Sequence, residues 1–123
     1  MNQLFLLAGM CFVATSAFAH GSNDLIVHGY VIDNACAGAH KNDLKEFVKK
    51  HDKMCLMKAD CAKAGYSIYS EDDGQLYKFD EASNQTVAGF LKDPNNRTDV
   101  VIIAEKNGEN LMIESIKNRR IVK

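Results

Sequence analysis

Residues 24–33 read DLIVHGYVID, and this stretch decides which fold the rest of the chain can build. Its residues alternate between two sides, and both sides are largely apolar. This pattern predicts a strand that is central in its sheet or strongly curved. Gly29 lies in the middle of the strand and indicates a β-bulge or a sharp bend. Such a bend suits the first strand of a small barrel.

The elements after this strand follow from periodicity and from turn residues. The pattern predicts a loop over 33–42, helices over 43–57 and 60–64, strands over 66–70 and 75–80, a helix over 84–92, and strands over 99–105 and 110–117. Asn107-Gly108 between the last two strands is a strong hairpin signal.

The order of these elements indicates the fold class. Without the helical segment over about 34–65, it is the order of the five-stranded Greek-key OB barrel, which has a helix between its third and fourth strands. The sequence therefore predicts an α+β fold. We expect a five-stranded OB-like Greek-key barrel, with a helical insert between strands 1 and 2 and a short helix between strands 3 and 4.

The first residues resemble an export signal. Residues 4–14 form an apolar run that is shorter than the about 20 residues needed to span a bilayer. Ala17-Phe18-Ala19 follows it and matches the small-residue cleavage pattern. We therefore interpret residues 1–19 as a signal peptide and residues 20–123 as a single OB-like domain, which is periplasmic or secreted.

Charge and motifs exclude several classes of function. The formal net charge is −1, so no basic excess is available to neutralise the phosphates of a nucleic acid. No second apolar run is long enough to cross a membrane after cleavage of the signal peptide. The sequence also has no Ser-His-Asp context, phosphate loop or C-x-x-C motif, so we expect a protein that is not an enzyme. We expect it to be a monomer.

Three cysteines remain after Cys11 leaves with the signal peptide: Cys36, Cys55 and Cys61. In an oxidising compartment two of them should pair. A disulfide from Cys36 to Cys55 or to Cys61 would tie the helical insert to the end of the first strand. Closing a loop of this size stabilises the fold by about 3 kcal/mol in the entropy model. The third cysteine would then be a buried, inert thiol.

A soft-metal site is the alternative use of the same residues. Three thiolates and one imidazole make a complete tetrahedral set for zinc or copper, and the candidate ligands are Cys36, His51, Cys55 and Cys61. His51 and Cys55 are four residues apart, which places them on one face of the predicted helix. Further candidates are His40, Met54 and Met57. His20 would become the new N-terminus, where its amine and imidazole form a copper chelate.

The chain resembles a family of small secreted bacterial proteins. The shared pattern consists of GYVIDNAC at 29–36, HDKMC at 51–55, CAKAGY at 61–66 and KFD at 78–80. Members often carry Met-Pro between the last two cysteines, where this chain has Lys58-Ala59. The resemblance covers nearly all of the chain after the signal peptide and implies no particular activity.

Two functions therefore follow from the sequence. The first is an exported binding or interaction module of unknown ligand, whose Cys/His insert is stabilised by a disulfide and which needs no cofactor. Its partner would be a protein or a glycan, contacted through Tyr30, Tyr66, Tyr69 and Tyr77. The alternative is a periplasmic copper- or zinc-binding protein that uses the Cys/His/Met cluster.

Overall fold

The structure, a computed structural model, describes residues 24–120. In chain order its elements are β1 (Asp24–Asp33), α1 (Asn34–Ala39), α2 (Leu44–Lys50), α3 (Lys53–Leu56), α4 (Ala59–Ala64), β2 (Tyr66–Ser70), β3 (Leu76–Lys78), α5 (Glu81–Lys92), β4 (Asp99–Asn107) and β5 (Asn110–Asn118). The predicted signal peptide and His20 lie outside the described residues. Within 24–120, none of the helices has the length and apolarity that crossing a bilayer needs.

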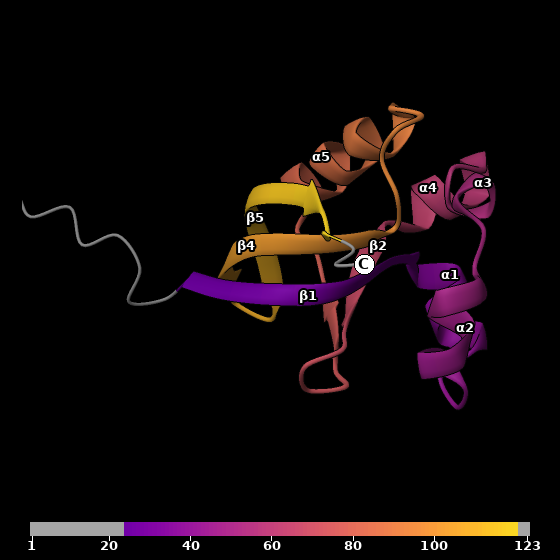
Figure 1. Cartoon of the computed structure of the whole chain (residues 1–123), viewed down its shortest axis with the longest axis horizontal. Helices are drawn as coiled ribbons and strands as arrows, with labels where there is room; N and C mark the ends of the chain where they lie inside the picture. The colour runs from indigo at the N-terminus through magenta and orange to yellow at the C-terminus, as the bar shows by residue number, and fades with distance from the viewer. Residues whose placement is uncertain (1–23, 121–123) are drawn as a thin grey trace, which may run out of the picture.

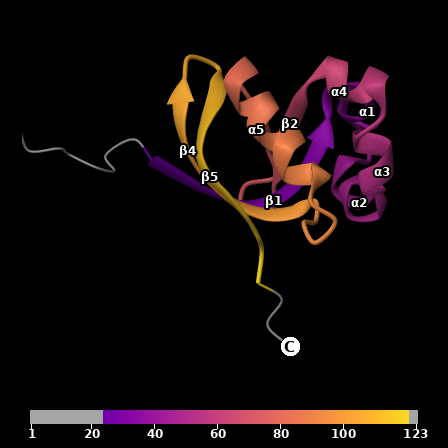
Figure 2. The same ribbon diagram turned by 90° about the horizontal axis from the view of Figure 1, so that it is seen from above.

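The five strands form one antiparallel sheet in the order β3-β2-β1-β4-β5. β1 pairs with β4 through residues 24–30 and with β2 through residues 29–33, so it lies at the centre of the sheet and curves along its length (Figure 1 and Figure 2). The predicted α+β class, the five strands and the helix between β3 and β4 are confirmed. The sheet is open, and the predicted closed barrel is not confirmed.

Gly29 allows the backbones of β1 and β2 to pack closely, and it does not form a bulge. The pairing of β1 runs through Gly29 without a shift on either side, so the expected bulge is wrong. A Cβ at this position would lie 1.8 Å from the carbonyl oxygen of Tyr69 on β2. Only glycine therefore allows the neighbouring strand to approach this closely. The sheet has its irregularity in β4 instead, between Ile103 and Ala104.

The main core lies on the inner side of the sheet, beneath α5. It is built from alternate residues of the strands together with Val87 and Leu91 of α5. Asp80 begins this helix, because its side chain accepts a hydrogen bond of 2.8 Å from the backbone N–H of Ser83. The buried members of the core are Val27, Val31, Leu56, Tyr66, Ile68, Phe79, Val87, Leu91, Val100, Ile102, Ala104 and Leu111.

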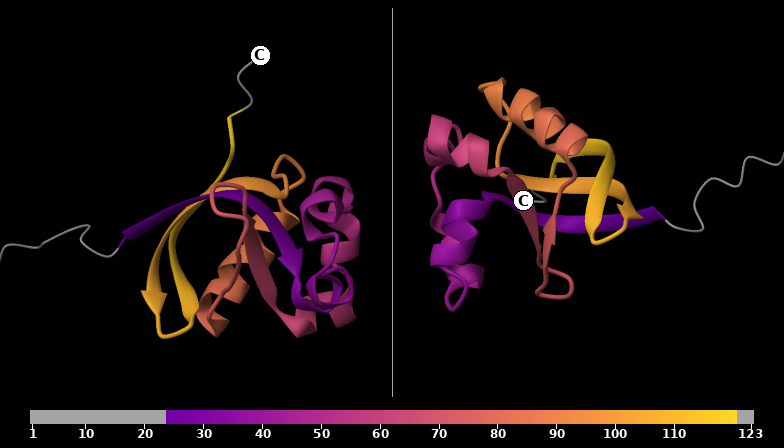
Figure 3. Two further views of the ribbon diagram at one scale, coloured as in Figure 1. Left: turned by 90° about the horizontal axis from the view of Figure 1, so that it is seen from below. Right: turned by 180° about the vertical axis from the view of Figure 1, so that it is seen from behind.

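A second, smaller cluster joins the helical insert to the sheet. Its buried residues are Ile32 of β1, Ala37 of α1, Val48 of α2 and Tyr69 of β2. The four short helices gather beyond the end of β1, away from the β4–β5 hairpin (Figure 3). Ile32 and Tyr69 come from the two central strands, so the insert packs against the sheet at the point where β1 ends.

The insert differs from the sequence-based expectation in two places. Residues 34–39 form helix α1 and not a loop, because Asp33 caps it. The single helix expected over 43–57 is broken into α2 and α3 at His51 and Asp52. The break occurs because the Asp52 side chain accepts a hydrogen bond from the backbone N–H of Met54 and begins a new helix. His51 and Cys55 therefore do not share one helix face.

Candidate functional site

Asp33 is the centre of the polar groups at the end of β1. The residue is fully buried, with 0% of its surface exposed. Its Oδ2 accepts a hydrogen bond of 2.9 Å from the backbone N–H of Cys36, which caps α1. The next residue, Asn34, donates its own backbone N–H to the carbonyl of Gly65 at 2.9 Å. The start of α1 is thus fixed to the end of α4, and the carboxylate is enclosed between them.

His51 approaches the same carboxylate from the other side of the insert. Its Nε2 lies 3.1 Å from Oδ1 of Asp33, and its side chain is only 7% exposed. The ring packs on Phe47 of α2, with 4.6 Å between the ring centres. His51 follows the last residue of α2, and its backbone N–H donates a hydrogen bond to the carbonyl of Phe47. Both oxygens of Asp33 therefore have partners within the insert.

Thiols complete the cluster. One ligand atom from each of Asp33, Cys36 and His51 lies within 4.8 Å of the others. The Cys61 thiol of α4 interacts with the Asp33 carboxylate and with the Cys36 thiol. Cys55 on α3 lies near Cys36 and contributes less to the raised pKa of that thiol than Asp33 does. The three cysteines within residues 24–120 are free, and each is partly exposed.

The carboxylate and the thiols shift each other's pKa values. Burial raises the pKa of Asp33, but hydrogen bonds from the Cys36 backbone and from His51 outweigh burial and hold the pKa below its usual value. Burial, followed by the negative charge of Asp33, raises the pKa of Cys36 to about 11. The same two causes raise the pKa of Cys61. Both thiols are therefore protonated at neutral pH, which is the opposite of an activated nucleophile.

The structure brings together some of the residues that the sequence indicated. Cys36 and His51 form one compact group with Asp33, and Cys61 interacts with Asp33 and Cys36 from outside the group of atoms that lie within 4.8 Å of one another. The sequence pattern did not assign Asp33 to the candidate ligands, because an aspartate at the end of a strand is most often a turn cap. The available signal was its position three residues before Cys36, where one side chain can both cap the helix and face the thiol.

The remaining candidate ligands are the two methionines and His40. Met54 is 69% exposed and Met57 is 37% exposed, so neither thioether is enclosed with the thiols. The His40 ring stacks on Phe47 with 3.6 Å between the ring centres, and its Nδ1 lies 3.2 Å from a carboxylate oxygen of Asp43.

The tyrosines expected to contact a partner are unequally available. Tyr66 is 2% exposed and Tyr69 is 8% exposed, and both belong to hydrophobic clusters. The hydroxyl of Tyr66 donates to the carbonyl of Leu56 at 3.0 Å. These two side chains therefore hold the insert to the sheet. Tyr30 and Tyr77 are partly exposed.

Comparisons with protein families, with curated proteins and with solved structures found no match to this chain.

Proposed function

We propose that this protein is a small exported binding module that holds one zinc ion in its helical insert. The ligands are Asp33, Cys36, His51 and Cys61. The observation that carries the proposal is a fully buried carboxylate 3.1 Å from an imidazole nitrogen, with one ligand atom each of Asp33, Cys36 and His51 within 4.8 Å of the others. The Cys61 thiol interacts with Asp33 and Cys36 and is the fourth proposed ligand.

The spacing of these atoms is close to that of a metal site. In a tetrahedral zinc site with bonds of 2.0–2.3 Å, two ligand atoms are about 3.3–3.8 Å apart. Oδ1 of Asp33 and Nε2 of His51 are already 3.1 Å apart. Small side-chain rotations of Cys36 would bring its sulfur to the same distance. Binding requires no movement of β1 or α1, because the first turn of α1 fixes both Asp33 and Cys36.

The charges also favour a divalent cation. A carboxylate in an apolar environment is stabilised by a nearby positive charge, and here it faces two neutral thiols. A bound cation would lower the pKa values of these thiols and convert them to thiolate ligands. One oxygen, one nitrogen and two sulfur atoms suit zinc. A Cu(I) site would draw on thioethers as well, and the side chains of Met54 and Met57 are exposed.

A disulfide would use two of the same sulfur atoms. The pairing of Cys36 with Cys55 or Cys61 stays a prediction, and a link between Cys36 and Cys61 would remove both thiolates from the zinc site. The interaction between the Cys36 and Cys61 thiols makes Cys61 the better partner. Metal binding and this disulfide are therefore alternative states of one pair of residues.

We also propose that the sheet closes into an OB-like barrel. Two contacts between the ends of β3 and β5 support closure. Phe79 forms a single parallel bridge with Leu111, and the backbone N–H of Asp80 donates to the carbonyl of Leu111 at 2.9 Å. These contacts join the two outer strands of the open sheet.

The zinc affinity of the reduced protein tests the metal proposal. We expect one zinc ion per chain in competition with a chromophoric chelator. Cys36→Ser and Cys61→Ser should each weaken zinc binding by about a hundredfold or more. Even residues that only hydrogen-bond to a metal ligand contribute about 10- to 100-fold to metal affinity, and a direct ligand should contribute at least as much. Cys55→Ser is the matched control and should bind zinc like the wild type. An equal loss in Cys55→Ser, or no stoichiometric binding, contradicts the proposed ligand set.

The pH dependence of binding gives a second check. Cys36 has a pKa of about 11 in the free protein, and the pKa of Cys61 is also raised. Both thiols must lose a proton when zinc binds, so affinity should rise with pH by up to about tenfold per unit for each thiol. The wild type should therefore show twice the logarithmic slope of Cys61→Ser. Equal slopes would remove Cys61 from the ligand set.

A further inference from the structure

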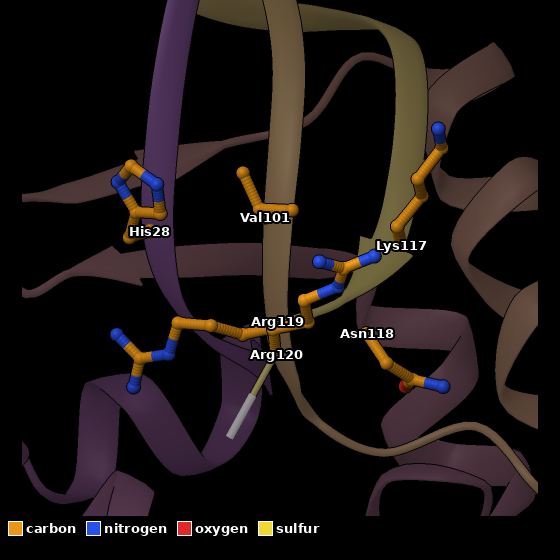
Figure 4. Close-up of a pocket in the computed structure, with 6 residues that line it drawn as sticks. All are labelled: His28, Val101, Lys117, Asn118, Arg119 and Arg120. Atoms are coloured by element: carbon orange, nitrogen blue, oxygen red, sulfur yellow. The ribbon is translucent and has the colours of Figure 1, made fainter. Parts of the chain in front are cut away.

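A cavity lies on the opposite side of the sheet from α5, and its lining includes none of the proposed zinc ligands. His28 of β1, Val101 of β4 and Lys117 of β5 are paired across the three strands and form one row (Figure 4). Arg119 and Arg120 follow the end of β5 and lie next to this row (Figure 4). Together with Asn118 these residues line a cavity of about 540 Å³. This volume is within the range of about 300–1,000 Å³ that is typical of small-molecule sites.

The side chains that line the cavity are unusual in their charge. The lining includes a histidine, a lysine and two arginines, and no carboxylate. The chain as a whole has a formal net charge of −1, so this gathering of bases does not reflect its composition. Side chains of one charge along a cavity favour a ligand of the opposite charge.

Three carboxylates neighbour the lining, and each has a partner. Asp72 pairs with His28 at 3.1 Å. Glu71 accepts two hydrogen bonds from Arg119, at 3.1 and 3.0 Å. Asp99 lies 2.6 Å from Nε of Arg119, an ion pair whose geometry is not that of a hydrogen bond. These contacts hold His28 and Arg119 in fixed positions, with the Arg119 guanidinium also 5.5 Å above the ring of Tyr30.

Two cations in the cavity are still available to a ligand. Among residues 24–120, no carboxylate forms an ion pair with Lys117 or Arg120. The side chain of Asn118 is already engaged, because its amide donates to Asn95 and Asn96 and its oxygen accepts from Arg97. An anion in the cavity would therefore meet the ammonium of Lys117 and the guanidinium of Arg120.

The floor of the cavity continues as an apolar strip. Val101 forms the floor beneath the bases, and the next row on the same side of the sheet pairs Ile103 with Ile26. Ile103 is 36% exposed and Ile26 is 62% exposed. A ligand that places a charged head between Lys117 and Arg120 can thus lay an apolar body along this strip.

We infer that this cavity binds a small organic anion, in which a carboxylate, phosphate or sulfonate head is attached to an apolar body. Lys117 and Arg120 supply affinity for the charged head. The apolar strip of Val101, Ile103 and Ile26 contacts the apolar body. The site shares no residue with the zinc ligands, so either site can fail without the other.

Fluorescence titration with anilinonaphthalene sulfonate tests the inference on the folded protein. We expect the dye to bind the wild type and to bind the double variant Lys117→Gln/Arg120→Gln about tenfold more weakly, since each exposed ion pair contributes roughly a factor of three. The matched control, Lys92→Gln/Lys106→Gln, removes two exposed lysines elsewhere and should bind like the wild type. Circular dichroism confirms that both variants are folded.

An uncharged dye distinguishes the contribution of the charged head from that of the apolar body. Phenylnaphthylamine has the same aromatic body without the sulfonate, and its affinity should be equal in the wild type and in both double variants. Displacement of the charged dye by octanoate or by octyl phosphate supports the proposed class and shows which head is preferred. The inference is overturned if neither compound displaces the dye, if both double variants weaken binding equally, or if Lys117→Gln/Arg120→Gln binds like the wild type.

Discussion

The two hydrophobic clusters of this protein differ in what surrounds them. The cluster beneath α5 joins all five strands through apolar side chains, and it contains no ionised group. The cluster under the helical insert has only four buried members, and it adjoins the buried carboxylate of Asp33 with its imidazole and thiols. The comparison indicates that the sheet supplies most of the apolar burial, while the insert holds the carboxylate, the imidazole and the thiols of the candidate site.

The helices of the insert cannot be stable by themselves. They have four to seven residues each, and isolated helices shorter than about 12–15 residues are marginal in water. Their positions depend on polar contacts, such as the Asp33 cap on α1 and the hydrogen bonds of 2.7 Å from Lys53 to the carbonyls of Asp93 and Asn96. The insert is therefore the part of the molecule whose order a bound metal can increase.

Shortening one buried side chain in each cluster should give the largest difference in the free energy of unfolding. Ile102→Ala, at a fully buried position of β4, should lower the free energy of unfolding by about 4 kcal/mol, because it leaves a cavity in the large cluster. Val48→Ala in the insert removes fewer atoms and should cost about 2 kcal/mol. Urea denaturation of both variants with chelator present measures the difference. Equal losses would show that the insert carries as much stability as the sheet.

Gly29→Ala tests whether the sheet sets the position of the site. The added Cβ would lie 1.8 Å from the Tyr69 carbonyl oxygen, so β1 and β2 must separate. We expect a loss of about 3 kcal/mol in the free energy of unfolding, together with weaker zinc binding.

Gly89 provides the control, because a Cβ there meets no atom within 4 Å. Gly89→Ala lies inside α5 and should stabilise the protein by about 0.5–1 kcal/mol. If Gly29→Ala left stability unchanged, the close approach of β1 to β2 would not be a constraint on the fold.

Asp33→Asn should weaken the insert in a pH-dependent way. The pKa of Asp33 is lowered in the folded protein, so its carboxylate stabilises the fold above about pH 4 and this contribution is lost as the pH falls through the lowered pKa. We expect Asp33→Asn to lose about 2 kcal/mol at pH 7 in the metal-free protein. The wild type should approach the variant as the pH falls through the lowered pKa of Asp33. A difference that stays constant with pH would contradict the ionised state of Asp33.

Most of the sheet could be predicted from the sequence, because its signals are local. The alternation of side chains over 24–33 predicted β1. The hairpin signal at Asn107-Gly108 matches the turn between β4 and β5, where Gly108 has a φ of +64°. α5 begins three residues earlier than expected, at Glu81, because Asp80 caps it. The predicted closure into a barrel is not confirmed, because closure depends on how closely β3 and β5 approach each other, and no local pattern contains that distance.

The insert was predicted less well, because local and periodic signals conflict there. Apolar residues at helical spacing continue from Leu44 to Cys55, and this period indicates one helix. Asp52 overrides it, since its side chain bonds to the backbone and starts a new helix. The burial of Asp33 follows from contacts with His51, eighteen residues away, which no local pattern contains.

Cobalt substitution examines the proposed zinc site in a single spectrum. Co²⁺ bound by Asp33, Cys36, His51 and Cys61 should give the intense visible bands of a tetrahedral ion and thiolate charge-transfer absorption. That absorption should fall by about half in Cys61→Ser, which removes one of two thiolates. It should be unchanged in Cys55→Ser. A pale octahedral spectrum, or charge-transfer absorption that falls in Cys55→Ser and persists in Cys61→Ser, would contradict a metal site centred on Asp33.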